Sequence, residues 1–149
     1  MSRPELLARH PVEIIPDGGF YEYEEEPQLT WRWAAKKAGL ILRNELDTPR
    51  SVEIRSMLET GAPGRLRVTT VRTEDQIEIS GTRDYERTIT LPAQGQVRLS
   101  FSCNCQRMKA PFDTRSLYFR LVNFRIVEPP ASTDRAGNDQ SYDITAHFN

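Results

Sequence analysis

The stretch QVRLSFSCNC, residues 96–105, decides the fold class because its residues alternate between two kinds. Apolar residues and the two cysteines occupy every second position, and polar residues fill the positions between them. Successive side chains of a β-strand point to opposite faces, so this period predicts a strand with one buried and one solvated face. The inward set is Val97, Leu99, Phe101, Cys103 and Cys105, and the outward set is Arg98, Ser100, Ser102 and Asn104.

The same alternation recurs along the chain, with Leu40 and Leu42 sharing one face and Val52, Ile54 and Leu58 sharing another. Turn sequences separate these runs at intervals of about 10 to 15 residues, a spacing typical of hairpins and too short for crossover helices. The sequence therefore predicts an all-β fold, an antiparallel β-sandwich of jelly-roll type with about eight strands. The turn sequences are DTPR at 47–50, GAPG at 61–64, SGTRD at 80–84, LPAQGQ at 91–96 and KAPFD at 109–113.

The apolar pattern changes parity within SLYFRLVNFRIV, residues 116–127. Phe119 and Leu121 share one face, whereas Phe124 has the opposite parity. A β-bulge near Val122 and Asn123 would return both halves to the core, and so would a strand buried on both faces. We expect a central or sheet-switching strand here.

A chain of 149 residues is the size of one ordinary domain. We divide it into a lead-in at 1–17, with a short helix within PELLARH, a sandwich at 18–127, and a connector with a C-terminal tail or edge strand at 128–149. The connector, EPPASTDRAGNDQS, is rich in Pro, Ser, Asp and Gly, a composition typical of flexible segments.

Charge and hydropathy exclude two classes of partner. Lys and Arg number 20 against 21 Asp and Glu, and the net charge of -1 gives no general field for nucleic acid. No apolar run approaches the roughly 18 to 20 residues that cross a bilayer, and the N-terminus lacks the apolar core of a signal peptide. We expect no nucleic acid partner and no membrane insertion, while the compartment stays open.

Aromatic and acidic residues crowd the stretch GGFYEYEEEPQLTWRWAAKKAGLIL, residues 18–42. In a strand the two tryptophans share a face while the arginine between them projects from the other. Indole faces stack on the C–H face of a pyranose, and carboxylates and guanidinium groups bond its hydroxyls. One hypothesis is therefore a glycan platform whose ligand-binding residues are Tyr21, Glu22, Tyr23, Glu24, Trp31 and Arg32.

The alternative hypothesis is that the tryptophans are core, because aromatic pairs on sheets are ordinary core construction. In that arrangement Trp33 lies inside, with Tyr21 or Tyr23 at the surface. The run EYEEE, residues 22–26, is then a solvated acidic edge. Its carboxylates also suit Ca²⁺, although an Asp-rich loop of defined spacing is missing.

Other chemistry has little support in the sequence. Cys103 and Cys105 resemble half a zinc site, but the remaining soft ligands are His10 and His147, near opposite termini. Because both cysteines continue an apolar face, we expect small buried hydrophobic residues and no metal. With two histidines there is little to build a nucleophilic triad, and no spacing selects two catalytic acids. We expect no catalytic residues and no cofactor.

Two arginine patterns are given structural interpretations. Arg65 and Arg67 lie on one face of a strand, where a solvated surface is favoured over an anionic polysaccharide site. Asp113 and Arg115 are separated by one residue ahead of an apolar strand. A structural ion pair that closes the preceding loop is favoured there.

The segments GGFYEYE, WRWAAKKAGLIL and FDTRSLYFRLVNFRI resemble a β-sandwich domain appended to bacterial glycosyltransferases and found in other cell-surface polysaccharide proteins. The resemblance spans roughly residues 18–127 and is similar in turn to the galactose-binding-like jelly roll. It implies an accessory domain without catalytic residues, either a non-catalytic carbohydrate-associated module for a bacterial or cell-surface glycan, or a structural module that packs against a partner domain. The matching residues are Gly19, Phe20, Glu24, Arg32 and Trp33, then Asp113, Arg115 and Leu117.

Overall fold

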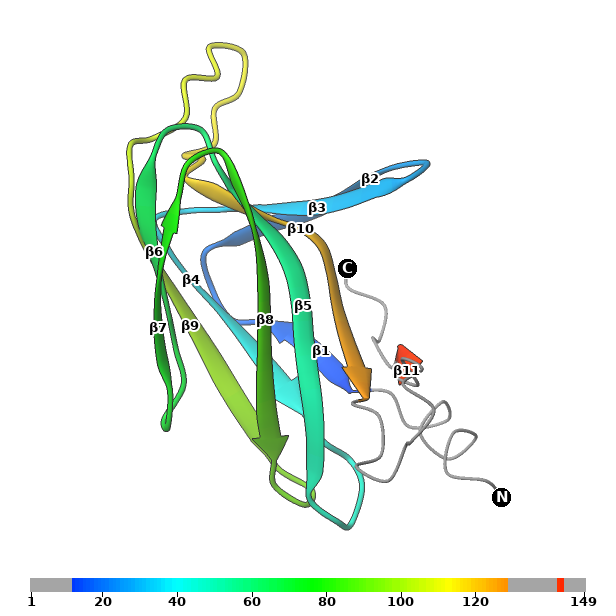
Figure 1. Cartoon of the computed structure of the whole chain (residues 1–149). Helices are drawn as coiled ribbons and strands as arrows, with labels where there is room; N and C mark the ends of the chain where they lie inside the picture. Colours follow the sequence, from blue (N-terminus) through cyan, green and yellow to red (C-terminus); the bar gives the residue numbers. More distant parts are fainter. Residues whose placement is uncertain (1–11, 129–141, 144–149) are drawn as a thin grey trace, which may run out of the picture.

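The computed structural model describes residues 12–128 and 142–143, which form two antiparallel β-sheets packed face to face (Figure 1). The first sheet has the order β1 (Glu13–Pro16), β4 (Lys37–Arg43), β9 (Gln96–Asn104), β6 (Gly64–Thr69), β7 (Glu74–Ile79). The second has the order β2 (Phe20–Glu26), β3 (Leu29–Ala34), β10 (Phe119–Glu128), β5 (Arg50–Thr60), β8 (Thr82–Leu91), and β11 (Tyr142–Asp143) pairs with β10.

This arrangement confirms the predicted antiparallel β-sandwich. The chain passes repeatedly from one sheet to the other, and the described residues contain eleven strands and no helix. All five predicted turn sequences fall at connections between strands. The turn between β6 and β7 was not predicted, because its residues include no Gly or Pro. The described residues accordingly include no helix long and apolar enough to cross a membrane.

The core lies between the two sheets and consists mainly of residues that period-two alternation assigned inward, although Val97 and Cys105 are only partly buried at its border. Leu99, Phe101 and Cys103 of β9 are buried, and Leu40 and Leu42 of β4 pack beside them. Three aromatic rings from three strands close one end of this core, with centroid separations of 5.5 to 6.1 Å. Edge-to-face contacts at such distances add to the energy of burial. The rings belong to Phe20, Phe101 and Phe119.

The predicted bulge in β10 is present. The register between β10 and β5 shifts between Val122 and Arg125. Asn123 has a φ of 51°, a left-handed conformation that asparagine tolerates better than most residues. The extra residue lets Leu121 before the bulge and Phe124 after it both face the core, as the change of parity required.

A polar contact joins the two sheets at the edge formed by β7 and β8. Tyr85 of β8 is buried, and its hydroxyl donates a hydrogen bond of 2.8 Å to Oδ2 of Asp75 on β7. Arg87 lies 3.5 Å from the other carboxylate oxygen. Burial and this acidic partner raise the pKa of the Tyr85 phenol above its ordinary value, so the phenol stays neutral and keeps its role as donor.

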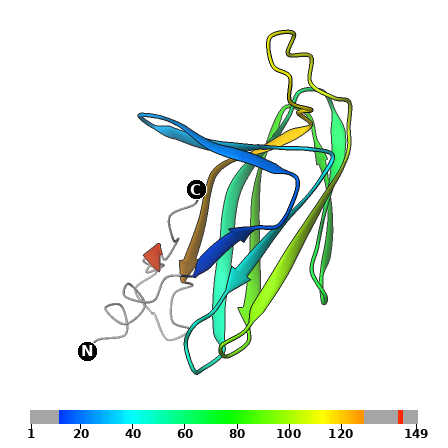
Figure 2. The same ribbon diagram turned by 180° about the vertical axis from the view of Figure 1, so that it is seen from behind.

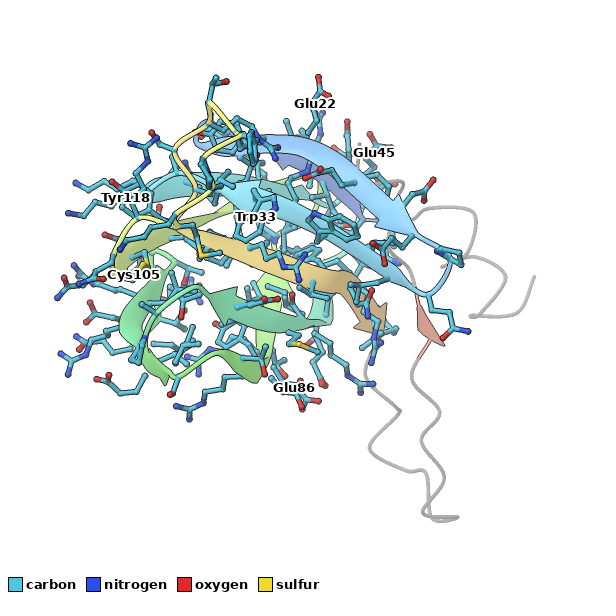
Figure 3. All side chains as sticks on the ribbon, turned by 90° about the horizontal axis from the view of Figure 1, so that it is seen from above. Glu22, Trp33, Glu45, Glu86, Cys105 and Tyr118 are labelled. Atoms are coloured by element: carbon cyan, nitrogen blue, oxygen red, sulfur yellow. A yellow bond between two sulfur atoms is a disulfide. The ribbon has the colours of Figure 1, made fainter. Side chains whose placement is uncertain are left out.

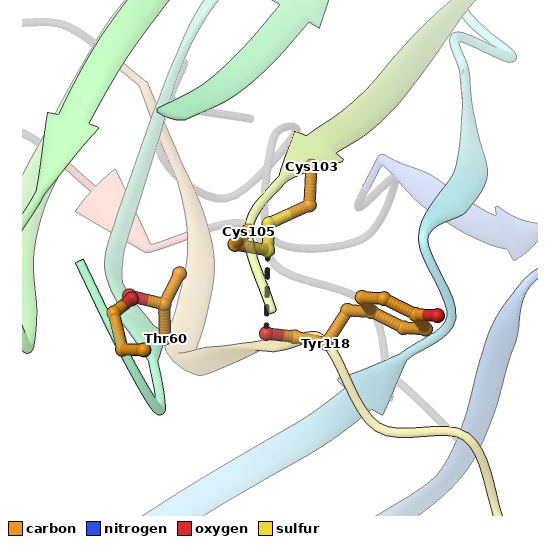
Figure 4. The surroundings of a disulfide bond; sticks show 5 residues. Thr60, Cys103, Cys105 and Tyr118 are labelled. Carbon is orange, nitrogen blue, oxygen red and sulfur yellow. Dashed lines mark hydrogen bonds between the residues drawn. A yellow bond between two sulfur atoms is a disulfide. The ribbon is translucent and has the colours of Figure 1, made fainter. Parts of the chain in front are cut away.

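The two cysteines are joined as a disulfide, which corrects the expectation of two separate buried thiols (Figure 4). Strand β9 ends at Asn104, so the chain leaves the extended conformation and brings the Cα atoms of Cys103 and Cys105 to 5.4 Å. This separation lies within the range of disulfides. Cys103 remains buried as expected, whereas Cys105 is partly exposed near the carbonyl of Tyr118.

The predicted N-terminal helix and both histidines lie outside the described residues. Of the predicted connector and tail at 128–149, the structure describes only Glu128 and the two residues of β11. Within the described chain, β1 lies before residue 18 and pairs with β4 at the edge of the first sheet. The β2–β3 hairpin and the loop of residues 105–118 between β9 and β10 project from the same end of the sandwich (Figures 1 and 2). The candidate site lies at this end.

Candidate functional site

Two rows of side chains line the outer surface of the second sheet at the projecting end. In an antiparallel sheet, residues that are directly paired point to the same side. The register therefore places Glu24, Trp31, Val122 and Met57 in one row across β2, β3, β10 and β5. The adjacent row contains Trp33, Arg120 and Glu59. We name the surface made by Glu24, Trp31, Trp33, Arg120 and Glu59 the tryptophan face; Figure 3 looks onto it, with Trp33 labelled beside β3 and β10.

Both tryptophans are partly exposed on this outer face, so the hypothesis that the pair belongs to the core is wrong. The predicted parity is confirmed, since Trp31 and Trp33 share a side of β3 and Arg32 occupies the other. The faces are the reverse of those in the core hypothesis, because Arg32 and Ala34 point toward the interior. The small side chain of Ala34 leaves space beside Phe119, which fills the core at this end.

Arg120 links the two indoles. Its guanidinium carbon lies 5.2 Å from the ring centroid of Trp31 and 5.1 Å from that of Trp33, within the range of cation–π attraction. Glu59 holds the same guanidinium, because its Oε2 accepts from Nε at 2.8 Å and lies 2.7 Å from Nη2. The four side chains therefore restrain one another, and Arg120 holds both indoles in place.

Glu24 fixes Trp31 from the opposite side. Its Oε2 accepts a hydrogen bond of 3.1 Å from the indole Nε1 and a longer one of 3.5 Å from Nη1 of Arg115. Arg115 belongs to the 105–118 loop, and its guanidinium also lies 5.4 Å from the ring centroid of Tyr21. The Tyr21 hydroxyl in turn donates to the carbonyl of Ser116 at 3.0 Å. The loop is thus docked on β2 beside the tryptophan face.

The structural ion pair expected between Asp113 and Arg115 is present. Nε and Nη2 of Arg115 reach the two carboxylate oxygens at 3.0 and 2.7 Å, and the Arg115 backbone N–H donates to Oδ1 at 2.9 Å. These hydrogen bonds to the charged form lower the pKa of Asp113 to about 2. They also raise the pKa of Arg115. The pair holds Arg115 in the orientation that reaches Glu24.

The six predicted ligand-binding residues divide between two surfaces. Glu24 and Trp31 lie on the tryptophan face, and Tyr21 contacts it through Arg115. The remaining three line a shallow pocket of the β2–β3 hairpin together with Phe20 and Tyr21. They are Glu22, Tyr23 and Arg32.

Arg32 differs most from its predicted role as an exposed partner for sugar hydroxyls. It is only 4% exposed and is paired in register with Tyr23 on β2 and Leu121 on β10. Burial lowers its pKa, and the nearby charge of Glu22 opposes that shift. A guanidinium in this position acts within the hairpin and does not reach the surface on which Trp31 lies.

Sequence reasoning missed three members of the site: Trp33, Arg120 and Glu59. The alternation of each strand contained part of the signal, because Arg120 and Glu59 occupy the polar parity of β10 and β5. The order β3-β10-β5 brings them together. Local patterns in the sequence carry no information about that order.

Other candidate chemistry has a structural explanation. Arg65 and Arg67 on β6 form ion pairs with Glu78 and Glu74 on the neighbouring β7, as expected of a solvated strand surface. Within residues 12–128 and 142–143, no three His, Cys, Asp or Glu side chains gather in a way that could hold a metal ion. The acidic run 22–26 is spread over both sides of β2, which separates its carboxylates.

Several solved structures align with this chain at low sequence identity. No family model matches the chain, and no curated protein matches by sequence. Xyl-CBM35, solved with a disaccharide containing glucuronic acid, aligns at 9% identity over 74% of this chain and 91% of its own, with a TM-score of 0.40. The carbohydrate-binding module CBM6cm-2 from Cellvibrio mixtus lichenase 5A, in complex with cellotriose, aligns at 13% identity over 80% and 92%, with a TM-score of 0.39.

A third solved structure is a family two carbohydrate esterase from Clostridium thermocellum, an active-site mutant. It aligns at 12% identity with a TM-score of 0.42, covering 93% of this chain but 34% of its own. This chain therefore spans about a third of that protein.

Proposed function

We propose that this protein is a non-catalytic carbohydrate-binding module whose glycan-binding surface is the tryptophan face. The observation that carries the proposal is the pair of partly exposed indoles on one side of β3, each restrained by charged neighbours. Large aromatic side chains kept at the surface, when the core of the same sandwich is filled by other residues, favour a role in recognition.

The chemistry of the face suits a sugar. A pyranose presents an apolar C–H face to an indole and hydroxyls around its edge, so it needs aromatic surface beside hydrogen-bonding groups. Trp31 and Trp33 supply the first, and Glu24 and Glu59 supply acceptors on either side of them. Because Arg120 and Glu24 already hold the rings, binding loses little side-chain entropy.

The predicted residues have different parts in this proposal. Glu24 and Trp31 contact the glycan, and Tyr21 acts through Arg115, which it helps to position. Glu22, Tyr23 and Arg32 shape the hairpin from its opposite surface.

A second candidate is a structural or interaction module without a sugar site, packed against a partner domain such as a glycosyltransferase. The same partly exposed indoles favour it, because aromatic residues are enriched in protein interfaces. Under this hypothesis the tryptophan face is covered by protein in the full assembly. The two candidates differ in whether the isolated chain binds a glycan.

A glycan microarray with the purified chain tests the proposal. We expect the chain to bind at least one glycan class, and Trp31→Ala and Trp33→Ala to abolish binding while circular dichroism shows that both variants remain folded. Their melting temperatures should fall by a few degrees, because each variant loses its contact with Arg120. Val71→Ala is the control, because it removes a side chain that is 97% exposed in the turn between β6 and β7, on the other sheet.

If either alanine variant fails to fold, Trp31→Phe and Trp33→Phe keep an aromatic ring and should weaken binding. A folded native chain that binds no glycan would contradict the proposal and favour the interaction module. Binding that persists in both folded tryptophan variants would also contradict it.

A further inference from the structure

The charges on and beside the tryptophan face leave it slightly acidic. Within the tryptophan face and the Asp113–Arg115 pair docked beside it, the charged groups are the two guanidiniums of Arg115 and Arg120 and the three carboxylates of Glu24, Glu59 and Asp113. The sum is one net negative charge. An anionic ligand therefore meets no excess of positive charge on this surface.

The Nε–Nη2 edge of each guanidinium is occupied by a carboxylate. Arg115 directs Nε and Nη2 to Asp113 and Nη1 to Glu24. Arg120 directs Nε and Nη2 to Glu59. A sugar carboxylate would have to displace these partners to gain a side-on bidentate contact with Nε and Nη2, and it would leave a protein carboxylate without its cation.

The carboxylates, in contrast, keep open acceptors. Every described contact of Glu24 and of Glu59 uses Oε2. Within the part of the chain that the structure describes, Oε1 of each has no hydrogen-bond partner. An ionised carboxylate has about four lone-pair sites and no donor, so each of these groups can accept from hydroxyls.

The two acceptors lie on different strands, with the aromatic surface between them. The order β2-β3-β10-β5 separates the strand of Glu24 from that of Glu59 by three spacings, about 14 Å at about 4.8 Å each. The indoles of Trp31 and Trp33 and the side chain of Met57 lie within that span. Its length exceeds a single sugar ring and suits a short oligosaccharide laid across the strands.

We infer that the tryptophan face selects uncharged oligosaccharides, which lie across β2, β3, β10 and β5 with hydroxyls donated to Glu24 at one end and Glu59 at the other. This inference rests on the proposed function, since it names the ligand class and the orientation of the glycan at that site. Uronic acid oligomers are disfavoured, because they bring a like charge to carboxylates that already hold the available cations.

Isothermal titration calorimetry with the purified chain tests the inference. The probes are neutral hexose oligosaccharides and uronic acid oligomers of matched length, each measured at low and high sodium chloride. We expect the neutral series to bind with little salt dependence, because an uncharged ligand has no Coulomb attraction that salt could screen. We expect the uronic acid series to bind more weakly than the neutral series. Tighter binding of uronic acid oligomers, weakened by salt, would overturn the inference.

Two variants test the carboxylates. Glu24→Gln and Glu59→Gln should each weaken neutral binding by about tenfold or more, because a hydrogen bond to a charged acceptor is replaced by one to an amide. Glu59→Gln also releases Arg120 from its ion pair, so this variant should bind uronic acid oligomers more tightly than the native chain does. That gain would show that the ion pair with Glu59 keeps Arg120 from binding an anionic ligand. The control is Glu45→Gln, which makes the same change at an exposed position in the loop that precedes β5, whereas Glu59 lies near the end of that strand.

The outcomes separate this inference from the proposed function. Binding of uronic acid oligomers that requires Trp33 would keep the tryptophan face as a glycan site and refute its selectivity for uncharged ligands. Unchanged neutral binding in both glutamine variants would refute the assigned orientation. Absence of binding to both series, together with a blank glycan array, would refute the proposed function itself.

Discussion

The side-chain oxygen of Asn123 accepts a hydrogen bond of 2.9 Å from the backbone N–H of Thr30. Asn123 is the left-handed residue of the bulge in β10, and Thr30 lies in β3 next to Trp31. The contact therefore ties the bulge that serves the core to the strand that carries both indoles. The register of the core and the position of the tryptophan face depend on the same residue.

Asn123→Ala should destabilise the fold by about 1–2 kcal/mol, because alanine loses the hydrogen bond to Thr30 and disfavours the φ of 51°. Asn123→Gly loses the same hydrogen bond but accepts the left-handed backbone, so its loss should be smaller. Urea denaturation of both variants measures the difference. Equal losses would mean that the left-handed conformation makes no contribution.

The bulge was predictable because the sequence carries two independent signals at one place. The apolar parity of SLYFRLVNFRIV changes at Val122, and Asn123 is a residue type that tolerates a positive φ. Strand β9 was predictable for a related reason, since one side of QVRLSFSCNC packs on the core and the other meets water. Patterns confined to a single strand determine these features.

The tryptophan face was less predictable because the more apolar residues of β3 lie on the solvent side and a charged residue lies on the core side. Trp31 and Trp33 outrank Arg32 in apolar surface, yet Arg32 is the buried residue. Strand order then brings Arg120 and Glu59 to the indoles from segments distant in the sequence. Alternation fixes which residues share a side, but only tertiary packing decides which side faces the solvent.

The Asp113–Arg115 pair should contribute stability that depends on pH. The pKa of Asp113 is lowered to about 2 in the folded chain from an ordinary value of 3.8, so its stabilising effect is present above pH 3.8 and is lost as the pH falls toward 2. Acid denaturation of the native chain and of Asp113→Asn measures this effect. The variant should lose less stability than the native chain across that interval. Identical acid profiles would contradict the prediction.

The Tyr85–Asp75 contact should matter at alkaline pH. Because the folded pKa of Tyr85 is raised above 10.0, its contribution is complete below pH 10 and declines as the pH rises above that value. Tyr85→Phe should cost about 0.5–1.5 kcal/mol at pH 8 through loss of the hydrogen bond, and should show a smaller further loss at pH 11. Urea denaturation at both pH values tests this. Tyr118→Phe is the control, because its hydroxyl makes no hydrogen bond among the described contacts.

Arg120 and Glu59 should be energetically coupled through their direct ion pair. Arg120→Met removes the cation–π contacts and the ion pair while keeping an extended apolar chain, and we expect a loss of about 1–2 kcal/mol in the free energy of unfolding. Glu59→Gln should cost less, and the double variant should cost less than the sum of the two. Tryptophan fluorescence provides a second measurement, because indoles released from Arg120 should gain mobility and emit at longer wavelength in Arg120→Met than in the native chain.

Arg65→Met is the matched control, since Arg65 pairs with Glu78 on the other sheet and contacts neither indole. Additive losses together with an unchanged emission spectrum would show that Arg120 does not hold the tryptophan face in place.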